Sequence, residues 1–237
     1  MRRALIAFLI ASSLVCVRLA TAQSSTGIIK GTVVAKGKVP GNSIIRMGVD
    51  PKCAQLNEGA RVIQQVFAAT IDNHLGNVFV RVIGSFPATP VPKDPVVIDQ
   101  RKCVYAPRVV GMRLGQTLQF RNVDQVLHNV HSSSAHENSF NVAQPIAGMV
   151  YSFTPKNEEV MVKIGCDVHR WMPAYVGVVT NPYFAVSGAD GSFEIRNVPA
   201  GKYTLEAWHE QLRTVTSAVI VKNGATATAG LTYEIKN

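Results

Sequence analysis

A thiol, an imidazole and a thioether are spaced along one short segment in the second half of the chain. Cys166, His169 and Met172 follow one another at intervals of three residues, and a second imidazole, that of His128, lies well upstream. Two imidazoles, one thiolate and a weak axial thioether suit Cu(I) and Cu(II) almost equally, so an electron can enter and leave with little rearrangement. These four residues therefore indicate a single type 1 (blue) copper ion that transfers electrons.

Other metal centres suit the same residues less well. A structural zinc site takes four cysteine, histidine or carboxylate ligands, which would leave Met172 without a role. A dinuclear copper centre would need a second cysteine in the same loop, but the nearest other cysteine is Cys103. The main rival ligand is His131. Because side chains alternate along a strand, His131 should face away from the metal if His128 faces it.

The ligand loop resembles that of a known family. Its C-x2-H-x2-M spacing, together with the HNVH sequence at 128–131, is similar to that of the amicyanins, which are cupredoxins. The resemblance implies that Asn129 hydrogen-bonds across to the cysteine loop, a contact of the kind that orients ligands and tunes the metal. It covers roughly residues 95–180 and implies a Greek-key β-sandwich that binds copper through His128, Cys166, His169 and Met172.

Residues 1–22 have the features of a secretory signal peptide. Arg2 and Arg3 precede an apolar run at 4–17, and small residues follow at 20–22, where cleavage would occur. The apolar run is short for a bilayer, and no later stretch approaches the ~20 apolar residues that a spanning helix needs. We therefore expect a protein that a bacterium exports, to the periplasm or beyond, with no transmembrane segment in its mature part.

The four cysteines of the chain leave one pair for a disulfide. Cys16 would be removed with the signal peptide and Cys166 is expected on copper, so Cys53 and Cys103 remain in an oxidising compartment. We predict that these two are bonded, which would stabilise the fold by roughly 4 kcal/mol in the chain-entropy model. The alternative is a pair of free, buried thiols.

The chain is basic, with 24 lysines and arginines against 15 aspartates and glutamates and a net charge of +9 at pH 7. Loss of the three arginines of the signal peptide would leave 21 basic residues and a net charge of +6. A basic surface steers acidic partners toward it, so we expect an acidic redox protein as the partner, or loose association with an anionic membrane. Nucleic acid is not expected, because the basic residues are scattered and form no nucleic-acid-binding motif.

Short runs of Val, Ile, Thr, Tyr and Phe recur along the chain, separated by Gly, Pro, Asn and Asp. This pattern predicts an all-β fold. A short helix is expected near 53–59. The clearest strand candidates lie at 28–35, 78–83, 118–121, 160–164, 176–179, 192–195, 202–207 and 214–221.

The segment 185–208 has a different signature, with turns at 190–191 and 199–201 between alternating strands. It resembles carboxypeptidase regulatory-like domains of the transthyretin type and the small sandwich domain of rhamnogalacturonan lyases. These resemblances imply a second small β-sandwich and bring no catalytic residues. Either the cupredoxin is inserted between two halves of this sandwich, or an N-terminally extended cupredoxin carries a short appended one. The expected segments are 23–94 and 181–237 for the sandwich and 95–180 for the cupredoxin.

The sequence predicts an exported carrier of single electrons and not an enzyme. Copper enzymes add centres built from many histidines, typically as His-x-His pairs, whereas this chain has six histidines and no such pair. We expect His169 at an exposed edge as the electron port, with Trp171 and Pro173 in an apolar docking patch. Two alternatives stay open: a metal-free cell-surface binding module, and a periplasmic protein for copper storage or delivery.

Overall fold

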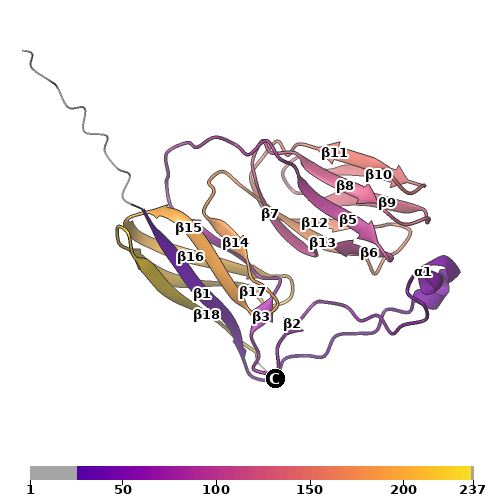
Figure 1. Ribbon diagram of the computed structural model, residues 1–237, viewed down its shortest axis with the longest axis horizontal. Helices are drawn as coiled ribbons and strands as arrows, with labels where there is room; N and C mark the ends of the chain where they lie inside the picture. The colour runs from indigo at the N-terminus through magenta and orange to yellow at the C-terminus, as the bar shows by residue number, and fades with distance from the viewer. Residues whose placement is uncertain (1–25, 236–237) are drawn as a thin grey trace, which may run out of the picture.

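The computed structural model describes residues 26–235, and the expected signal peptide at 1–22 lies outside the described residues. Two β-sandwiches lie side by side, and a short α-helix stands at the end of a long excursion of the chain (Figure 1). The predicted all-β class, with two β-sandwiches, is confirmed. Among the described residues, no helix is long and apolar enough to span a bilayer.

The first sandwich, which we call the insert, is built from β5 to β13. Its five-stranded sheet has the order β10-β9-β12-β13-β7, and its four-stranded sheet has the order β11-β8-β5-β6. Ile98, Phe120 and Ile164 are fully buried between the sheets, where side chains from the two inner faces interdigitate. The strands are β5 (Val96–Arg101), β6 (Val104–Ala106), β7 (Val109–Arg113), β8 (Leu118–Asn122), β9 (His128–Ser133), β10 (Phe140–Gln144), β11 (Val150–Phe153), β12 (Glu159–Gly165) and β13 (Ala174–Val179).

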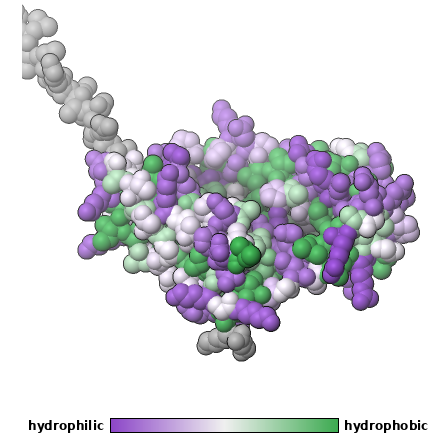
Figure 2. Space-filling view, turned by 60° about the horizontal axis from the view of Figure 1, so that its bottom comes forward, coloured by the Kyte–Doolittle hydropathy of each residue, from purple (hydrophilic) through white to green (hydrophobic). Residues whose placement is uncertain are grey.

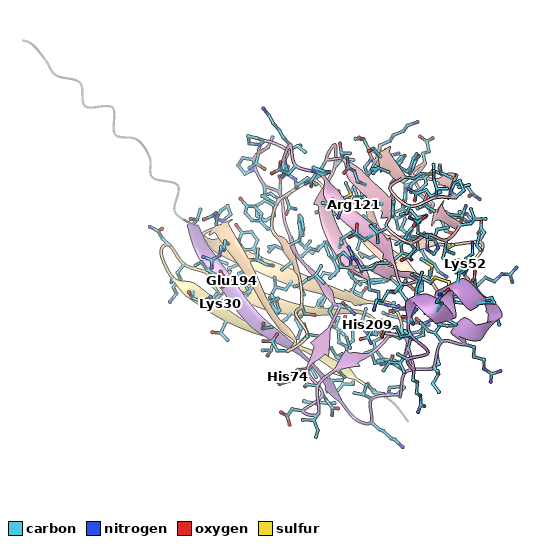
Figure 3. The ribbon with its side chains drawn as sticks, turned by 45° about the vertical axis from the view of Figure 1, so that its right-hand side comes forward. Lys30, Lys52, His74, Arg121, Glu194 and His209 are labelled. Atoms are coloured by element: carbon cyan, nitrogen blue, oxygen red, sulfur yellow. A yellow bond between two sulfur atoms is a disulfide. The ribbon has the colours of Figure 1, made fainter. Side chains whose placement is uncertain are left out.

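The second sandwich, which we call the host, takes strands from both ends of the chain. β1 pairs antiparallel with β15 and parallel with β18, while β4 lies between β14 and β16 in the other sheet. Lys30 and Glu194, on β1 and β15, form an ion pair of 3.0 Å (Figure 3). The strands are β1 (Thr26–Lys36), β4 (Phe79–Ile83), β14 (Phe184–Val186), β15 (Ser192–Pro199), β16 (Gly201–His209), β17 (Arg213–Val221) and β18 (Thr226–Glu234).

A long excursion of the host chain, residues 37–67, reaches the insert, and we call it the cap (Figures 1 and 3). Ile45 and Met47 anchor it, since both side chains are buried in the hydrophobic core of the insert. A helix lies where one was expected, and the side chain of Asp50 caps its first turn by accepting hydrogen bonds from two backbone amides. The elements in and after the cap are η1 (Met47–Val49), α1 (Pro51–Leu56), β2 (Ala68–Ala69) and β3 (Leu75–Gly76).

The contact between the two sandwiches depends on two positions without side chains. The ring of Phe79 in β4 lies against Gly111 in β7 and Gly177 in β13, which are partners in the insert sheet. A Cβ on Gly177 would stand 2.7 Å from the Phe79 ring. Nearby, Arg108 of the insert and Glu210 of the host form a partly buried ion pair with N–O distances of 2.6 and 2.9 Å. These contacts fix how the host, and with it the cap, sits against the insert.

We expect Gly177→Ala to destabilise the protein by about 1–3 kcal/mol, because the added methyl overpacks the contact with Phe79. Gly230→Ala is the matched control. Gly230 lies in β18, is exposed and has open space at its Cβ position, so its change should stay within about 0.5 kcal/mol. Urea unfolding measures both variants. Equal stabilities of the two variants would contradict the close contact.

Candidate metal centre

His128, Cys166, His169 and Met172 lie at one end of the insert. His128 is the first residue of β9, and Cys166 follows the last residue of β12, which is the neighbour of β9 in the sheet. The chain then passes through His169 and Met172 before β13 begins. All four residues are buried, with exposed fractions of 4% or less. Strand pairing thus brings together two segments that are far apart in the chain.

Three potential ligand atoms converge on one point. Nδ1 of His128 lies 3.1 Å from Nδ1 of His169, which in turn lies 3.8 Å from Sγ of Cys166. All three atoms lie within 4.8 Å of one another. Metal ions such as zinc form bonds of about 2.0 Å to imidazole nitrogen and about 2.3 Å to thiolate, so one ion of similar size could reach all three atoms. The residues present therefore fit a single metal ion.

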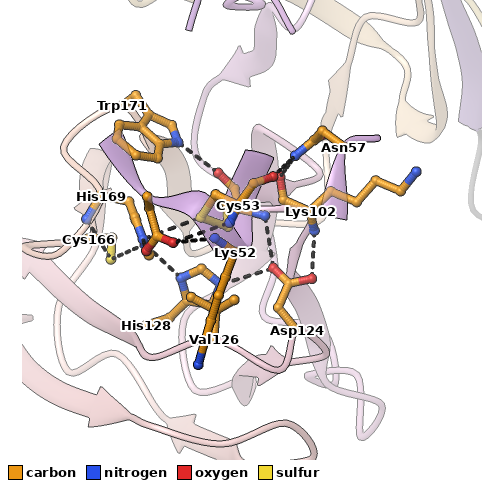
Figure 4. The surroundings of a disulfide bond; sticks show 12 residues. Lys52, Cys53, Asn57, Lys102, Asp124, Val126, His128, Cys166, His169 and Trp171 are labelled. Carbon is orange, nitrogen blue, oxygen red and sulfur yellow. Dashed lines mark hydrogen bonds and ion pairs between the residues drawn. A yellow bond between two sulfur atoms is a disulfide. The ribbon is translucent and has the colours of Figure 1, made fainter. Parts of the chain in front are cut away.

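Carboxylates fix the orientation and the tautomer of both imidazoles (Figure 4). Nε2 of His128 donates to Oδ2 of Asp124 at 2.9 Å, and Nε2 of His169 donates to Oδ2 of Asp50 at 3.0 Å. In a neutral imidazole the other nitrogen then carries a lone pair. The two Nδ1 atoms therefore face each other beside the sulfur of Cys166, where a cation, either a metal ion or a proton on one imidazole, relieves the repulsion between their lone pairs.

The surroundings favour the thiolate form of Cys166. Burial by itself would raise its pKa, but hydrogen bonds with His128 and His169 outweigh burial and lower the pKa to about 6. Burial likewise opposes a charge on His169, yet the neighbouring Cys166 and Asp50 raise the pKa of that imidazole. The centre therefore attracts positive charge at neutral pH.

Backbone and side-chain contacts hold the loop that carries Cys166. Oδ1 of Asn129 accepts a hydrogen bond from the amide of Asp167 at 2.9 Å, across from β9 to the cysteine loop. The hydroxyl of Tyr105 donates to the backbone oxygens of Asn129 at 2.7 Å and Gly165 at 3.0 Å. Within the loop, the amide of Met172 donates to the carbonyl of His169 at 2.9 Å. These bonds hold strand β9, which begins with His128, next to the loop that carries Cys166.

Cys53 and Cys103 form the disulfide expected from the cysteine count. Both sulfurs lie within 4.8 Å of a ring nitrogen of His169, so these three residues form one group of potential metal ligands. The sulfur of Cys103 forms a second such group with Asp124 and His128. A thiolate is the form of cysteine that binds metal, so sulfurs joined in a disulfide are poor candidates. Cys166 is the free cysteine of the described part of the chain, and its group with the two histidines is the one that suits a metal ion.

The expectation that His169 forms an exposed electron port is wrong, because the cap covers it. His169 is only 1% exposed, and its Nε2 contacts both Asp50 and the sulfur of Cys53. Trp171, expected in an apolar docking patch, is half-buried and donates from Nε1 to the carbonyl of Cys103 at 3.0 Å. The ligand loop alone cannot reveal this cover, since the covering residues come from a distant segment of the chain.

A surface groove between the sandwiches reaches the centre from another side. Cys166 and Met172 line it together with Lys163 and Arg170 of the insert and Glu210 of the host. Lys163 and Arg170 are exposed, whereas Glu210 is paired with a partly buried arginine. The exposed charges of the groove are therefore the two basic side chains of Lys163 and Arg170 and one carboxylate, that of Asp167, which contacts His131.

The sequence reasoning missed two residues of this site, Asp50 and Asp124. Asp124 could have been noticed, because it lies four residues before His128 and a carboxylate often holds the distal nitrogen of a ligand imidazole. Asp50 gives no such local signal, since it lies 119 residues from His169 in the chain. Only the path of the cap brings it to the site.

The family described as polysaccharide lyase family 4, domain II matches residues 167–229. This segment begins in the ligand loop and ends in β18, so it includes strands of the insert and of the host. The match agrees with the resemblance to a lyase-associated sandwich, whereas the carboxypeptidase regulatory-like resemblance stays a prediction. No curated protein matches the chain.

Solved structures of copper proteins are similar to part of the chain. The copper-containing nitrite reductase of Thermus scotoductus is 18% identical, with a TM-score of 0.34, over 40% of this chain and 24% of that chain. A purple cupredoxin of Nitrosopumilus maritimus is 22% identical, with a TM-score of 0.31, over 35% and 98%. The amicyanin of Paracoccus versutus is 24% identical, with a TM-score of 0.33, over 42% and 96%.

We expect protein that lacks residues 1–22, unfolded without metal, to show one reactive thiol before reduction and three after it, because the disulfide masks two of the three remaining cysteines. Reduction should also lower the free energy of unfolding by about 4 kcal/mol. Thiol titration and urea unfolding with and without a dithiol reductant measure these effects. Three reactive thiols before reduction would rule out the pairing.

Proposed function

We propose that this protein is an exported type 1 copper protein that carries single electrons between redox partners. Bound copper would alternate between Cu(I) and Cu(II). The ligands would be His128, Cys166 and His169, with Met172 as the weak axial ligand. The observation that carries the proposal is the close grouping of Nδ1 of His128, Nδ1 of His169 and Sγ of Cys166 within 4.8 Å of one another.

The ligand types favour copper over zinc. A thiolate and two imidazoles with a buried thioether form the set in which Cu(I) and Cu(II) are both accommodated, whereas zinc has no use for Met172. The loop is held by its own hydrogen bonds and by Asn129, so the ligand atoms would move little when an electron arrives. The disulfide between Cys53 and Cys103 suits an oxidising compartment outside the cytoplasm.

A carrier fits better than an enzyme. In the described part of the chain, every group of three potential metal-binding side chains includes His128 or His169, so a separate catalytic metal centre has no candidate ligands there. His209 is buried, and its Nε2 contacts the carbonyl of Val66 at 3.0 Å, as a structural residue would. The centre itself is closed on one side by the cap and open toward the groove only at its edge.

We propose the groove beside Cys166 as the place where electrons enter and leave, since the cap covers His169. Exposed Lys163 and Arg170 in the groove would attract an acidic redox partner. The described residues on the face in Figure 2 mix hydrophilic with hydrophobic side chains over both sandwiches, and no single apolar patch dominates it.

Purified protein loaded with Cu(II) should be intensely blue or green, with one copper per chain, from thiolate-to-copper charge transfer. Cys166→Ser should abolish the colour because it removes the thiolate. His131→Gln is the matched control, since that imidazole is half-exposed and contacts Asp167, and its colour should persist. Absorption, electron-spin resonance and metal analysis measure these outcomes. Colourless protein that retains zinc in preference to copper would refute the proposal.

The joint variant Lys163→Glu, Arg170→Glu should slow reduction of the Cu(II) protein by an anionic inorganic complex about tenfold at low salt, because it reverses the charge of the groove. The effect should shrink at 0.15 M salt, where charges are screened beyond about 8 Å. The control, Lys202→Glu with Lys222→Glu, makes the same change of net charge on exposed host positions outside the groove. Stopped-flow rates that fall equally in both variants would place electron entry elsewhere.

A further inference from the structure

Each of the two imidazoles of the centre donates its distal N–H to a carboxylate. His128 contacts Asp124, whose side chain is 4% exposed, and His169 contacts Asp50, whose side chain is 26% exposed. The distances of 2.9 and 3.0 Å are those of normal hydrogen bonds. Two negative charges therefore lie directly behind the two imidazoles, in addition to the thiolate of Cys166.

Asp124 is held rigidly by the backbone. Its Oδ1 accepts from the amide of Lys102 at 2.7 Å, and its Oδ2 accepts from the amide of Cys103 at 2.8 Å as well as from His128. Lys102 and Cys103 both have positive φ angles, 52° and 57°, so both amides of this turn can point at one carboxylate. Donors on both oxygens stabilise the ionised form of Asp124, and its pKa is lowered although burial works against this.

Asp50 belongs to the cap and has two roles. Its Oδ1 accepts from the amides of Lys52 at 2.9 Å and Cys53 at 3.3 Å, and so begins helix α1. Its Oδ2 accepts from Nε2 of His169. A carboxylate from the host part of the chain, that of Asp50, therefore contacts His169 of the insert, on the side where the centre would otherwise meet solvent.

The disulfide joins the supports of the two carboxylates. Cys53 follows Asp50 by one helical turn and helps to hold its Oδ1, while Cys103 donates to Asp124. Asn57, at the end of α1, also donates to the carbonyl of Lys102 at 3.1 Å. The two supports therefore form one connected unit behind the imidazoles (Figure 4).

We propose that Asp50 and Asp124 are positioning residues that bias the bound metal toward Cu(II) and so lower the reduction potential of the centre. This rests on the proposed function. A carboxylate that accepts the distal N–H makes an imidazole more basic, and nearby negative charge stabilises the more highly charged ion. The effect is large where water is excluded, and both imidazoles are buried. The flanking Lys52 and Lys102 are exposed, so solvent screens their opposing charge.

Asp50→Asn is the sharpest test, because the asparagine oxygen can still cap the helix while its amide nitrogen replaces Oδ2, which removes both the negative charge and the acceptor for Nε2 of His169. We expect its reduction potential to rise by about 59 mV or more. For one electron, this corresponds to a tenfold or larger change in the ratio of Cu(II) affinity to Cu(I) affinity. Asp124→Asn should shift the potential in the same direction. Glu58→Gln is the matched control, since Glu58 is exposed on the same cap and contributes the same charge. Redox titration of the copper-loaded protein measures all three.

A potential unchanged in Asp50→Asn, or shifted equally in Glu58→Gln, would overturn the proposal.

A second experiment uses metal-free protein, so that it does not depend on copper binding. Proton NMR should show slowly exchanging Nε2 protons on His128 and His169, and Asp50→Asn should speed exchange only at His169. If the wild-type protein binds no copper, the proposed function fails. Protected Nε2 protons would then still support the positioning contacts, whereas rapid exchange would refute these as well.

Discussion

Two imidazole nitrogens and the sulfur of Cys166 meet at a buried point at one end of the insert, and the rest of the site follows from that constraint. Nδ1 of His128 and Nδ1 of His169 lie 3.1 Å apart with Cys166 beside them, and carboxylates take the protons on the other side. Such an arrangement is costly without a cation, because buried negative charge and lone pairs repel one another. The fold must therefore supply the support that holds the ligands together.

That support comes from two parts of the chain that belong to different sandwiches. The insert provides paired strands β9 and β12, which bring His128 next to Cys166. The host provides the cap, and the contact of Phe79 with Gly111 and Gly177 sets where the host stands. The strand pairing of β1 with β15 and β18 favours the first of the two arrangements considered from the sequence, in which the insert interrupts one host sandwich, since the cap then begins and ends on the same body.

The sequence was sufficient for the features that depend on local pattern. Alternating apolar residues predicted the all-β class, and the cysteine count predicted the bond between Cys53 and Cys103. The convergence of His128 with Cys166 was expected from the resemblance of the HNVH sequence and the ligand loop to the amicyanins, since the two residues lie far apart in the chain. The burial of His169 could not be predicted, because the covering residue Asp50 lies 119 residues away in the chain and no local sequence pattern indicates so distant a contact.

The cap changes what the centre can exchange with its surroundings. An imidazole edge that is open to solvent gives an electron a short path to a partner, but it also admits water and competing ligands. Here Asp50 and the disulfide occupy that edge, so in the function that we propose a partner would approach through the groove at Cys166, where Lys163 and Arg170 lie. Rigid ligands and a closed edge would favour retention of a bound metal over its release, so the carrier function that we propose fits this architecture better than delivery does.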